Sequence, residues 1–404
     1  MDKYKYIILG AGPAGLTFAN RLKENGINSF LVIEKESEAG GLCRDKMVDG
    51  SPLDIGGGHF LDVRNKVVDE YLFRFMPEDE WNYFERDSRI RFLEYEINHP
   101  FEANIWQLPR EKQNEYLESI SAAGCNNGKE KPKKFVDWIT WKLGDKIAED
   151  YMLPYNQKMF SNDLNELGTY WLDKLPNVSF EDTFNSCRDR HAYGKQPGHA
   201  QFLYPKKYGY GEVWRRMADA ISDNIIYNST VDSLDIKNRI VSCGGTSLIG
   251  DNIITTIPWN SINLLSGFSE ETLKSVFDLK HSAVEIRYFP ETMDTKAQWI
   301  YYPDPEISYH RILVRSNFCL GSKGYWTETR KERIINSNNQ FSYMNEYAYP
   351  LNTIKKPAIM KKIISEAEAN DVYPLGRWGE HMHYNSDVTV SRSLEMANIL
   401  IKYK

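Results

Sequence analysis

Residues 4–15, YKYIILGAGPAG, decide the fold of this chain of 404 residues. The apolar, β-branched run Tyr4–Leu9 predicts a buried strand, and a glycine-rich turn follows it directly. Beyond the turn, apolar residues at helical spacing predict a helix; they are Leu16, Ala19 and Leu22. Gly26 ends this helix, and Ser29–Ile33 is predicted to be a second buried strand with Glu34 at its carboxyl end. The order strand, turn, helix, strand predicts a Rossmann-type βαβ unit.

The glycines of the turn have separate roles in dinucleotide binding. Gly10 permits the tight turn, Gly12 lets the backbone approach a pyrophosphate, and Gly15 lets helix and strand pack closely. The pyrophosphate would lie at the positive end of the helix. Glu34 comes 19 residues after Gly15, where a carboxylate is expected to accept hydrogen bonds from ribose hydroxyls.

The composition excludes several classes of protein. The net charge of −6 and the pI near 5.9 give no basic footprint for nucleic acid, and Lys129–Lys134 is predicted to be a solvated loop. The five cysteines are scattered and odd in number, so a reducing compartment is expected and no metal site is predicted. Neither a secretory signal nor an apolar run of about 20 residues is present. We therefore expect a soluble, cytoplasmic protein without stable membrane insertion, either a monomer or a homo-oligomer.

Two further glycine clusters bear on the cofactor. Gly40-Gly41-Leu42 follows the second strand, and Asp54–His59, DIGGGH, comes somewhat later. At these positions the chain resembles the glutathione-reductase-type flavoproteins, within the amine-oxidase-like branch. In that branch the second cluster runs along the flavin, where glycines let the backbone lie close to a flat ring. The resemblance implies FAD, whereas the first glycine motif alone fits FAD and NAD equally.

The rest of the chain predicts an α/β fold in which an FAD-binding Rossmann-type domain is interleaved with helical and antiparallel-sheet substrate domains. Helical spacing is present in Pro132–Asp150, Val213–Ser222, Ala358–Ala369 and Val388–Lys402. Strands are predicted in Asn224–Ile236, Asp251–Ile257 and Ala283–Arg315, and a polar turn in Asn336–Gln340. The predicted domains are 1–95 (FAD), 96–200 (helical), 201–260 (return to FAD), 261–350 (antiparallel sheet) and 351–404 (FAD).

Several downstream segments are similar to the UDP-galactopyranose mutase family, especially its eukaryotic form. Each segment is weak alone, but their common order and spacing carry the resemblance over the whole chain. The segments are His99–Asn104 with Leu108-Pro109, Lys133–Trp138, Pro154–Phe160, Tyr204-Pro205 with Gly209 and Gly211, Trp299–Pro303, Tyr309–Arg311, Tyr349-Pro350 and Leu375–Arg377.

The resemblance implies a nucleotide-sugar mutase that interconverts pyranose and furanose rings. In that family the N5 atom of reduced FAD attacks the anomeric carbon and no net oxidation occurs, so NAD(P)H or another reductant must first reduce the flavin. Negative charge grows on the leaving diphosphate, which calls for cations there. Arg311 and Arg377 match the family's diphosphate arginines, and His59 matches a histidine beside the flavin.

The resemblance assigns the site residues to three groups. The catalytic residues are Arg311, Arg377 and His59. The cofactor-binding residues are Gly10, Gly12, Ala14, Gly15, Glu34, Gly41, Leu42, Gly57, Gly58, His59, Val231, Gly376 and Arg377. The substrate-binding residues are Phe101, Tyr155, Asn156, Phe160, Trp299, Tyr301, Arg311, Tyr349, Arg377, His383, Tyr384 and Asn385.

The chain departs from the family pattern at the substrate. His383 occupies a position where the family has tyrosine, and Asn385 matches a following Asn or Asp. On the side of the base, His99 replaces tyrosine, Glu102 replaces glutamine and Phe160 replaces tryptophan. A glutamate cannot donate to a base carbonyl as a glutamine does, so the base and the sugar stay open.

Of three alternative interpretations, a metal site is rejected, and an oxidoreductase and a non-enzyme scaffold stay open. The pair of imidazoles in His381-Met382-His383 could suggest a metal, but no acidic or thiol partners accompany it in the sequence, so this interpretation is rejected. A true oxidoreductase of the amine-oxidase-like class would transfer hydride to the flavin. A flavoprotein scaffold without turnover is the non-enzyme alternative, suggested by the altered tyrosine and base-side positions.

Overall fold

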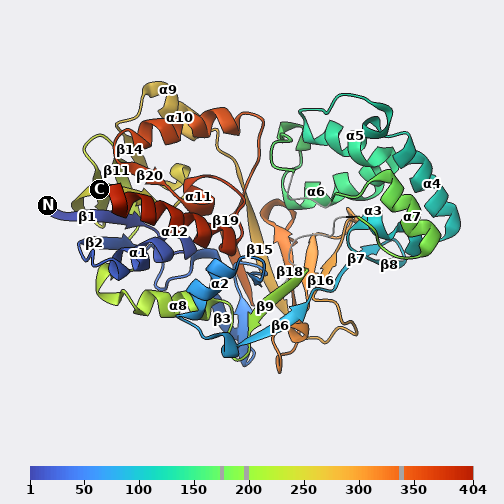
Figure 1. The fold of residues 1–404 in the computed structure, drawn as a ribbon, viewed down its shortest axis with the longest axis horizontal. Coiled ribbons are helices and arrows are strands. Elements are labelled where there is room, and N and C mark those ends of the chain that lie inside the picture. Colours follow the sequence, from blue (N-terminus) through green and yellow to red (C-terminus); the bar gives the residue numbers. More distant parts are fainter. Residues whose placement is uncertain (173–176, 195–199, 336–340, 404) are drawn as a thin grey trace. The chain divides into compact units, whose positions relative to one another are not determined.

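The computed structural model describes residues 1–172, 177–194, 200–335 and 341–403. The chain divides into two compact units. Unit 1 comprises Met1–Asn82, Leu203–Lys280 and Lys355–Lys404, and unit 2 comprises Tyr83–Phe202 and His281–Ile354. Each unit is therefore assembled from segments far apart in the sequence, and each has a large sheet of its own (Figure 1).

Unit 1 is built on an eight-stranded sheet. The strand order is β10-β2-β1-β13-β12-β11-β14, and β20 also pairs with β13. Strand β1 pairs in parallel with both β2 and β13, as a Rossmann unit requires. The strands are β1 Asp2–Leu9, β2 Phe30–Ile33, β10 Ile225–Ile226, β11 Val231–Asp235, β12 Ile240–Cys243, β13 Thr246–Thr255, β14 Leu264–Ser266 and β20 Val372–Pro374.

Helix α1, Pro13–Glu24, starts directly at the glycine-rich turn. Gly12 is its N-cap and Pro13 its first residue, a position where the missing N–H of proline costs nothing. Gly26, with φ of +74°, turns the chain out of the helix. Helix α12, Ser386–Tyr403, lies beside α1 (Figure 1). The other helices of unit 1 are α2 Lys66–Phe73, α8 Gly211–Asp219, α9 Glu270–Val276, α10 Lys356–Glu368 and α11 Gly376–Gly379.

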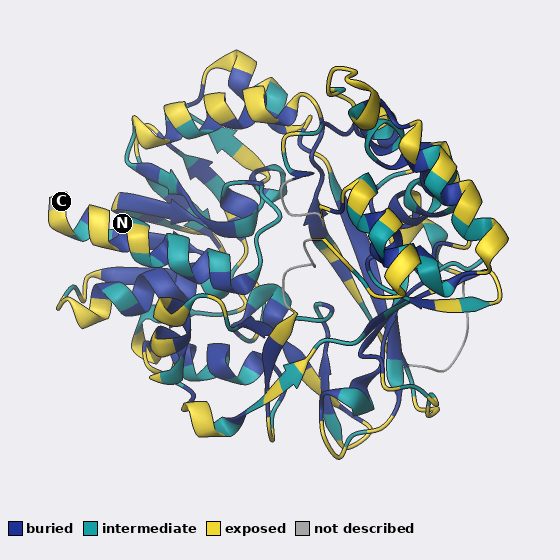
Figure 2. Ribbon diagram, turned by 45° about the vertical axis from the view of Figure 1, so that its right-hand side comes forward, coloured by how far each residue is buried: buried dark blue, intermediate teal, exposed yellow. Residues whose placement is uncertain are grey.

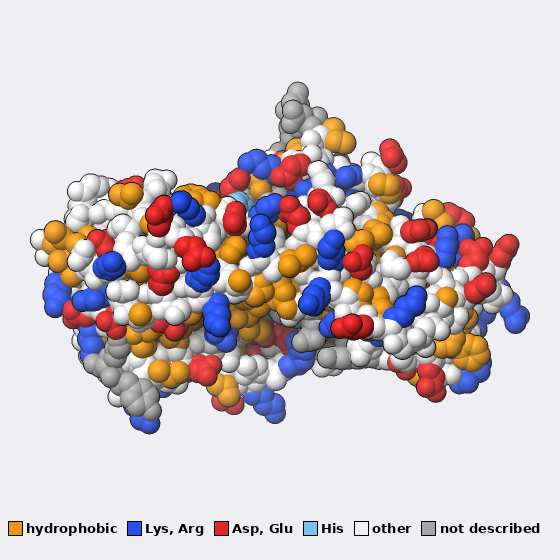
Figure 3. Space-filling model, turned by 90° about the horizontal axis from the view of Figure 1, so that it is seen from above, with side chains coloured by type: hydrophobic (Ala, Val, Ile, Leu, Met, Phe, Trp, Pro, Cys, Tyr) orange, Lys and Arg blue, Asp and Glu red, His pale blue; other side chains and the backbone are white. Residues whose placement is uncertain are grey.

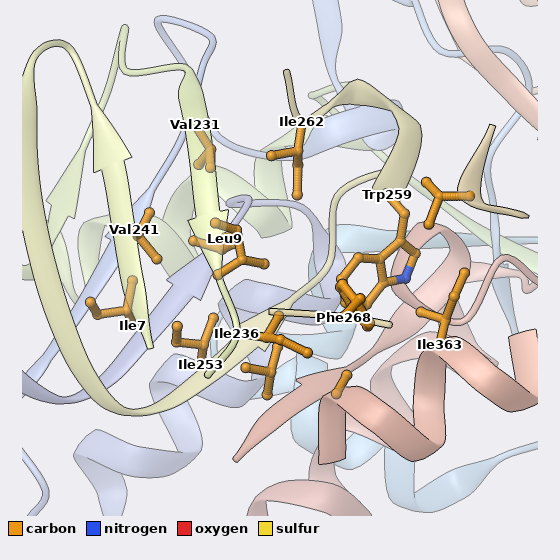
Figure 4. Close-up of a cluster of buried hydrophobic side chains, with 14 of the residues drawn as sticks. Ile7, Leu9, Val231, Ile236, Val241, Ile253, Trp259, Ile262, Phe268 and Ile363 are labelled. Atoms are coloured by element: carbon orange, nitrogen blue, oxygen red, sulfur yellow. The ribbon is translucent and has the colours of Figure 1, made fainter. Parts of the chain in front are cut away.

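The core of unit 1 lies between the sheet and the helices that cover it. Figure 4 shows Trp259 and Phe268 packed together near Ile363 of α10, with strand residues such as Ile7 and Ile253 in the same cluster. Trp259 has no exposed surface, and its Nε1 donates to the Gly379 carbonyl at 2.8 Å. Burial of such large side chains, each about 1.5–3 kcal/mol, fixes the sheet that carries the glycine-rich turn.

Short strands complete the connections of unit 1. Strands β3 Asp45–Val48 and β4 Ser51–Asp54 form a hairpin, and β5 Leu61–Asp62 follows. The chain passes between the units within β6 Trp81–Glu85 and again within β9 Gln201–Pro205.

Unit 2 is built on a seven-stranded sheet of order β19-β15-β18-β17-β16-β7-β8. All its pairs are antiparallel except β16 with β7. Its central strands are largely buried (Figure 2). The strands are β7 Ser88–Phe92, β8 Tyr95–Asn98, β15 His281–Phe289, β16 Trp299–Tyr301, β17 Arg311–Leu313, β18 Tyr325–Arg330 and β19 Ser342–Pro350. The helices are α3 Phe101–Asn104, α4 Arg110–Ser121, α5 Phe135–Ile147, α6 Leu153–Met159 and α7 Phe180–Asp189.

The predicted α/β fold class is confirmed, but several boundaries differ. Residues 83–95 belong to unit 2, because β7 pairs with β16 and so extends the seven-stranded sheet. Residues 261–280 belong to unit 1, because β14 pairs with β11. The region Asn224–Ile236, predicted as strand, contains two separate strands, β10 and β11. Strand β13 begins five residues before Asp251, where the sequence predicted its start. The turn predicted over Asn336–Gln340 lies outside the described residues.

Candidate functional site

The glycine-rich turn after β1 has the geometry that its sequence predicts. Gly10 has φ of +101°, a conformation that side chains rarely adopt. A Cβ on Gly15 would lie 2.0 Å from the Gly10 carbonyl oxygen, so helix and turn touch there through backbone alone. A Cβ on Gly12 would meet only the Gly41 Cα, at 3.8 Å. The glycine at position 12 is therefore not required by the packing of the protein itself.

Glu34 is buried at the end of β2 and braces this turn. Its Oε2 accepts from the Ala11 N–H at 2.7 Å, and its Oε1 accepts from the Glu36 N–H at 3.0 Å. Burial raises the pKa of Glu34, whereas these two backbone N–H groups and the Arg44 guanidinium lower it. In the structure this carboxylate therefore stabilises the turn through backbone hydrogen bonds; its contact with a ribose stays a prediction.

The second glycine cluster lies against the first, and the third lies against the second. Gly41 has φ of +54°, and a Cβ there would lie 3.2 Å from the Gly12 Cα. A Cβ on Gly56 would lie 1.7 Å from the Leu42 carbonyl oxygen, so only glycine fits at position 56. The His59 Nδ1 is 3.0 Å from the Gly57 carbonyl oxygen. The backbones of three loops that are separate in the sequence therefore pack closely together.

A pair of buried carboxyl groups lies in the hairpin that connects the second and third glycine clusters. Asp45 and Asp54 are directly opposite each other in the β3–β4 hairpin. Asp45 accepts from the Gly211 N–H and from Arg215, and Asp54 accepts from the Tyr204 hydroxyl at 3.0 Å. Burial raises the pKa of both carboxyl groups, and the proximity of Asp45 raises that of Asp54 further.

Arg377 is held close to the glycine-rich loops. A Cβ on Gly376 would lie 2.6 Å from the Ala14 Cβ, so this residue touches the start of α1. The Arg377 guanidinium donates from Nε and Nη2 to the Tyr384 carbonyl, at 3.0 and 2.8 Å. Burial raises the pKa of the Cys43 thiol to about 12, and the nearby charge of Arg377 opposes this. The predicted cofactor residues of the three loops and of α11 are therefore brought together in unit 1.

The other residues of unit 1 that are predicted to bind substrate or cofactor differ in their burial and in their contacts. The Tyr384 ring lies 5.3 Å from the Arg392 guanidinium, and the Asn385 carbonyl accepts from Thr389 at the start of α12. His383 is half-buried. The side chain of Val231 is part of the apolar core. The buried His381 has its Nε2 3.0 Å from the Lys280 carbonyl oxygen, and no group of three or more His, Cys, Asp or Glu in the described ranges is placed to hold a metal.

Arg311 is the centre of the predicted substrate residues of unit 2. It is paired across the strands with Tyr301 on one side and Glu328 on the other. Its guanidinium donates to the buried Glu328 carboxylate from Nε at 2.7 Å and to the Tyr349 hydroxyl from Nη2 at 3.3 Å. Burial raises the pKa of Glu328, but Arg311 and His310 outweigh it and bring the pKa to about 2. Arg311 is therefore a fixed cation, oriented by a permanently charged carboxylate.

Arg86 is a second arginine of this region that the sequence did not single out. Its Nη2 donates to the Tyr301 hydroxyl at 2.6 Å, and its guanidinium stacks over the Trp299 ring at 4.7 Å. The charge-rich run from Glu85 to Arg91 carries no pattern that distinguishes this arginine from its neighbours. Only the pairing of β16 with β7 places this stretch of chain next to Trp299 and Tyr301.

The aromatic residues predicted to contact substrate include two pairs of contacting rings in unit 2. Tyr155 meets the Tyr301 ring edge-on at 5.7 Å, and Phe160 meets Tyr349 at 6.3 Å. Asn156 donates from Nδ2 to the Met152 carbonyl, one turn earlier in the chain. Phe101 has no exposed surface and packs as a core residue of unit 2. Its contact with substrate stays a prediction.

Glu102 and His99 are buried in unit 2 beside these aromatic rings. The His99 ring lies 5.1 Å from the Tyr301 ring, and burial lowers the pKa of His99 to about 3. Only 8% of Glu102 is exposed. Burial raises the pKa of this glutamate to about 7, while the backbone and Lys142 oppose the shift weakly.

The burial of Glu102 predicts that unfolding becomes easier as pH rises. Since the folded pKa of about 7 exceeds the unfolded value of 4.5, the stabilisation is fully present below pH 4.5 and is lost as pH rises through 7. The full effect is about 3 kcal/mol. Urea unfolding at pH 5 and pH 8 measures it, and Glu102→Gln should remove this part of the pH dependence. A variant as pH-dependent as the wild type would contradict the assignment.

Comparison of the sequence with protein families identifies the class of its N-terminal domain. Residues 8–75 match the family model described as NAD(P)-binding Rossmann-like domain, so the chain carries a dinucleotide-binding domain of this class. The particular fold is that of UDP-galactopyranose mutase. A crystal structure of reduced UDP-galactopyranose mutase superposes with a TM-score of 0.90 at 22% identity, over 99% of this chain and 94% of that chain. The resemblance seen in the sequence is thus confirmed as a likeness of fold.

Other relatives give shorter or more distant likenesses. UDP-galactopyranose mutase of Mycoplasma pneumoniae is 29% identical over 84 residues, 20% of this chain and 21% of that protein. An uncharacterised protein of Methanothermococcus thermolithotrophicus is 30% identical over 101 residues, 23% of this chain and 95% of that protein, so the two belong to one family over this segment. A putative protoporphyrinogen oxidase from Exiguobacterium superposes with a TM-score of 0.73 at 12% identity, over 100% of this chain and 99% of that chain. The fold is thus shared with proteins of low sequence identity.

Proposed function

We propose that this protein is a flavin-dependent mutase of a nucleotide-diphosphate sugar, which interconverts the pyranose and furanose forms. The observation that carries the proposal is Arg311, a guanidinium fixed by the buried Glu328 and directed at the hydroxyl of Tyr349. A fixed cation next to phenol hydroxyls suits a leaving diphosphate, whose charge grows as the glycosidic bond breaks. The likeness of fold to UDP-galactopyranose mutase supports this choice of substrate class.

The residues of unit 1 fit FAD. Because a Cβ on Gly12 would meet almost no protein, the glycine there is explained by a group that approaches the backbone from outside. The N-terminus of α1 starts at this glycine and would bind the pyrophosphate, and Glu34 would accept from a ribose hydroxyl. The loops with Gly41, Leu42, Gly57, Gly58 and His59 would lie along the flavin ring. Gly376 and Arg377 would flank it.

FAD, when bound and reduced, would supply a nucleophilic nitrogen for the anomeric carbon of the sugar. The protein's own part is to bind and orient the substrate. We assign the diphosphate to Arg311, Arg377, Tyr301 and Tyr349. The sugar and the base are assigned to the remaining predicted residues, which are Trp299, Tyr155, Asn156, Phe160, Phe101, His383, Tyr384 and Asn385.

We infer the remaining properties from the same proposal. Unit 1 would be the FAD-binding part and unit 2 the substrate-binding part. NAD(P)H or another reductant would keep the flavin reduced, and the protein would act in the cytoplasm as a monomer or homo-oligomer.

In the part of the chain that the structure describes, no helix combines the length and apolar character needed to cross a bilayer. On the face in Figure 3, described Lys and Arg side chains alternate with Asp and Glu, which gives no support to a nucleic-acid partner.

The redox state of the flavin tests this function. The purified holoprotein should isomerise UDP-galactopyranose or a related nucleotide sugar after reduction by dithionite or NADPH, and should be silent with oxidised FAD. Chromatography of the nucleotide sugars measures the product, and anaerobic absorbance shows that the flavin stays reduced through turnover. Activity that is indifferent to the flavin's redox state would contradict the proposal.

A second candidate function is an FAD-dependent oxidoreductase of the amine-oxidase and protoporphyrinogen-oxidase-like class. The fold likeness to the putative protoporphyrinogen oxidase favours it. Stopped-flow spectra separate the two candidates. A substrate that bleaches oxidised flavin, followed by reoxidation with oxygen, would favour the oxidoreductase.

A further inference from the structure

A pocket of about 540 Å³ in unit 1 has no role in the function proposed above. It lies between the β3–β4 hairpin and the stretch from Lys207 to Gly209 that leads into α8. Its size falls within the roughly 300–1,000 Å³ typical of small-molecule sites. None of its lining residues is among those assigned to FAD or to the nucleotide sugar. The pocket therefore needs an explanation of its own.

The charged side chains of the pocket favour an anion. Lys46, Lys207 and Arg215 line it together with two acids, Glu38 and Asp45. Both acids already have cationic neighbours, because Asp45 accepts from Arg215 at 3.2 Å and Glu38 lies 3.8 Å from the Arg44 guanidinium. The lining has an excess of positive charge in a chain whose net charge is −6. Such a local reversal of sign concentrates anions.

One wall of the pocket is suited to a planar group. The Tyr208 ring is half-buried, with the Lys207 Nζ 5.5 Å from its centroid. The Arg216 guanidinium lies at the same distance from this ring and pairs with Glu80 at 2.7 Å. Two cationic groups therefore lie near this ring. A half-buried aromatic ring beside exposed lysines is a surface on which a base can stack while its phosphate meets the lysines.

We propose that this pocket binds a nucleoside phosphate. Lys46, Lys207 and Arg215 bind the phosphate oxygens by charge-assisted hydrogen bonds, and Tyr208 packs against the base. Arg215 is well suited to the role because its contacts with Asp45 and Glu212 hold the guanidinium in place in the lining of the pocket. The proposal does not depend on the mutase activity, since it uses none of the residues of that site.

Calorimetry on the FAD-loaded protein tests the proposal with adenosine monophosphate, uridine monophosphate, ribose 5-phosphate and inorganic phosphate as probes. We expect saturable binding of a nucleoside monophosphate that weakens as salt rises, and weaker binding of inorganic phosphate. The double variant Lys46→Glu/Lys207→Glu should bind at least about tenfold more weakly, which corresponds to about 1.4 kcal/mol.

A matched control has the same change in net charge outside the pocket. Lys206→Glu/Lys237→Glu replaces two exposed lysines of unit 1 that do not line it, and should bind like the wild type. A further variant, Tyr208→Leu, should reduce affinity for the nucleoside monophosphates while leaving inorganic phosphate unchanged. No saturable binding to the wild type, or an equal loss in both double variants, would overturn the proposal. Equal affinity for inorganic phosphate and the nucleoside monophosphates would overturn the choice of a nucleoside phosphate.

Discussion

A Gly12→Ala variant is expected to fold normally and to purify without the yellow colour of bound flavin. Gly12 has φ of −80°, which alanine adopts freely, and its Cβ would come no closer than 3.8 Å to another residue. The loss of stability should be about 1 kcal/mol or less, from a poorer N-cap. The methyl group would, however, occupy the place where the cofactor's pyrophosphate is proposed to approach, so FAD affinity should fall about 100-fold or more, roughly 2.7 kcal/mol.

Gly15→Ala is the matched comparison for this variant. Here the added Cβ would lie 2.0 Å from the Gly10 carbonyl oxygen, a backbone atom that cannot move without breaking the turn. This variant should lose about 3 kcal/mol or more of folding stability, in addition to its flavin. Flavin fluorescence titration and thermal unfolding of the two apoproteins separate these effects. If Gly12→Ala bound FAD as tightly as the wild type, the assignment of this turn to the cofactor would be wrong.

Replacing Arg311 by methionine is expected to abolish turnover and to destabilise unit 2. Glu328 is only 1% exposed and would remain as a buried charge without its guanidinium. Breaking such a pair costs about 3–5 kcal/mol. If Arg311 also stabilises the leaving diphosphate, kcat of the reduced protein should fall about 1,000-fold. Urea unfolding and the nucleotide-sugar assay measure the two effects separately.

The double variant Arg311→Met/Glu328→Gln separates the structural role from the catalytic one. It removes both charges, so most of the lost stability should return while turnover stays absent. Arg287→Met is the control, since it breaks another ion pair of the same sheet, at 2.8 Å from Glu285, outside the proposed site. Turnover that returned with stability in the double variant would show that Arg311 only supports the fold.

Local signals in the sequence were sufficient for the parts of the fold in which neighbours along the chain also lie together. The turn from β1 into α1 is such a part, because its glycines, Pro13 and the two strands lie within one stretch of 32 residues, Asp2–Ile33. Helices α5, α10 and α12 also lie close to their predicted positions, since helical spacing of apolar residues is a local pattern.

Features that depend on strand pairing could not be predicted from local sequence patterns. Glu328 orients Arg311 only because β17 and β18 pair in one particular register, and the intervening chain gives no sign of that register. Arg86 is brought to Trp299 by the contact of β16 with β7, two strands separated by about 200 residues. The enclosure of Phe101 by other aromatic rings likewise follows from packing that the sequence alone does not specify.

The division of the chain has a consequence for synthesis on the ribosome. Unit 2 has all its segments once residue 354 has been translated, whereas unit 1 lacks α10, β20 and α12 until the end of the chain. Because β20 pairs with β13 and α12 packs on α1, the Rossmann-type part of unit 1 is incomplete until β20 and α12 have been translated. The nascent protein would therefore expose an unfinished sheet edge through most of elongation, during which chaperones could protect it.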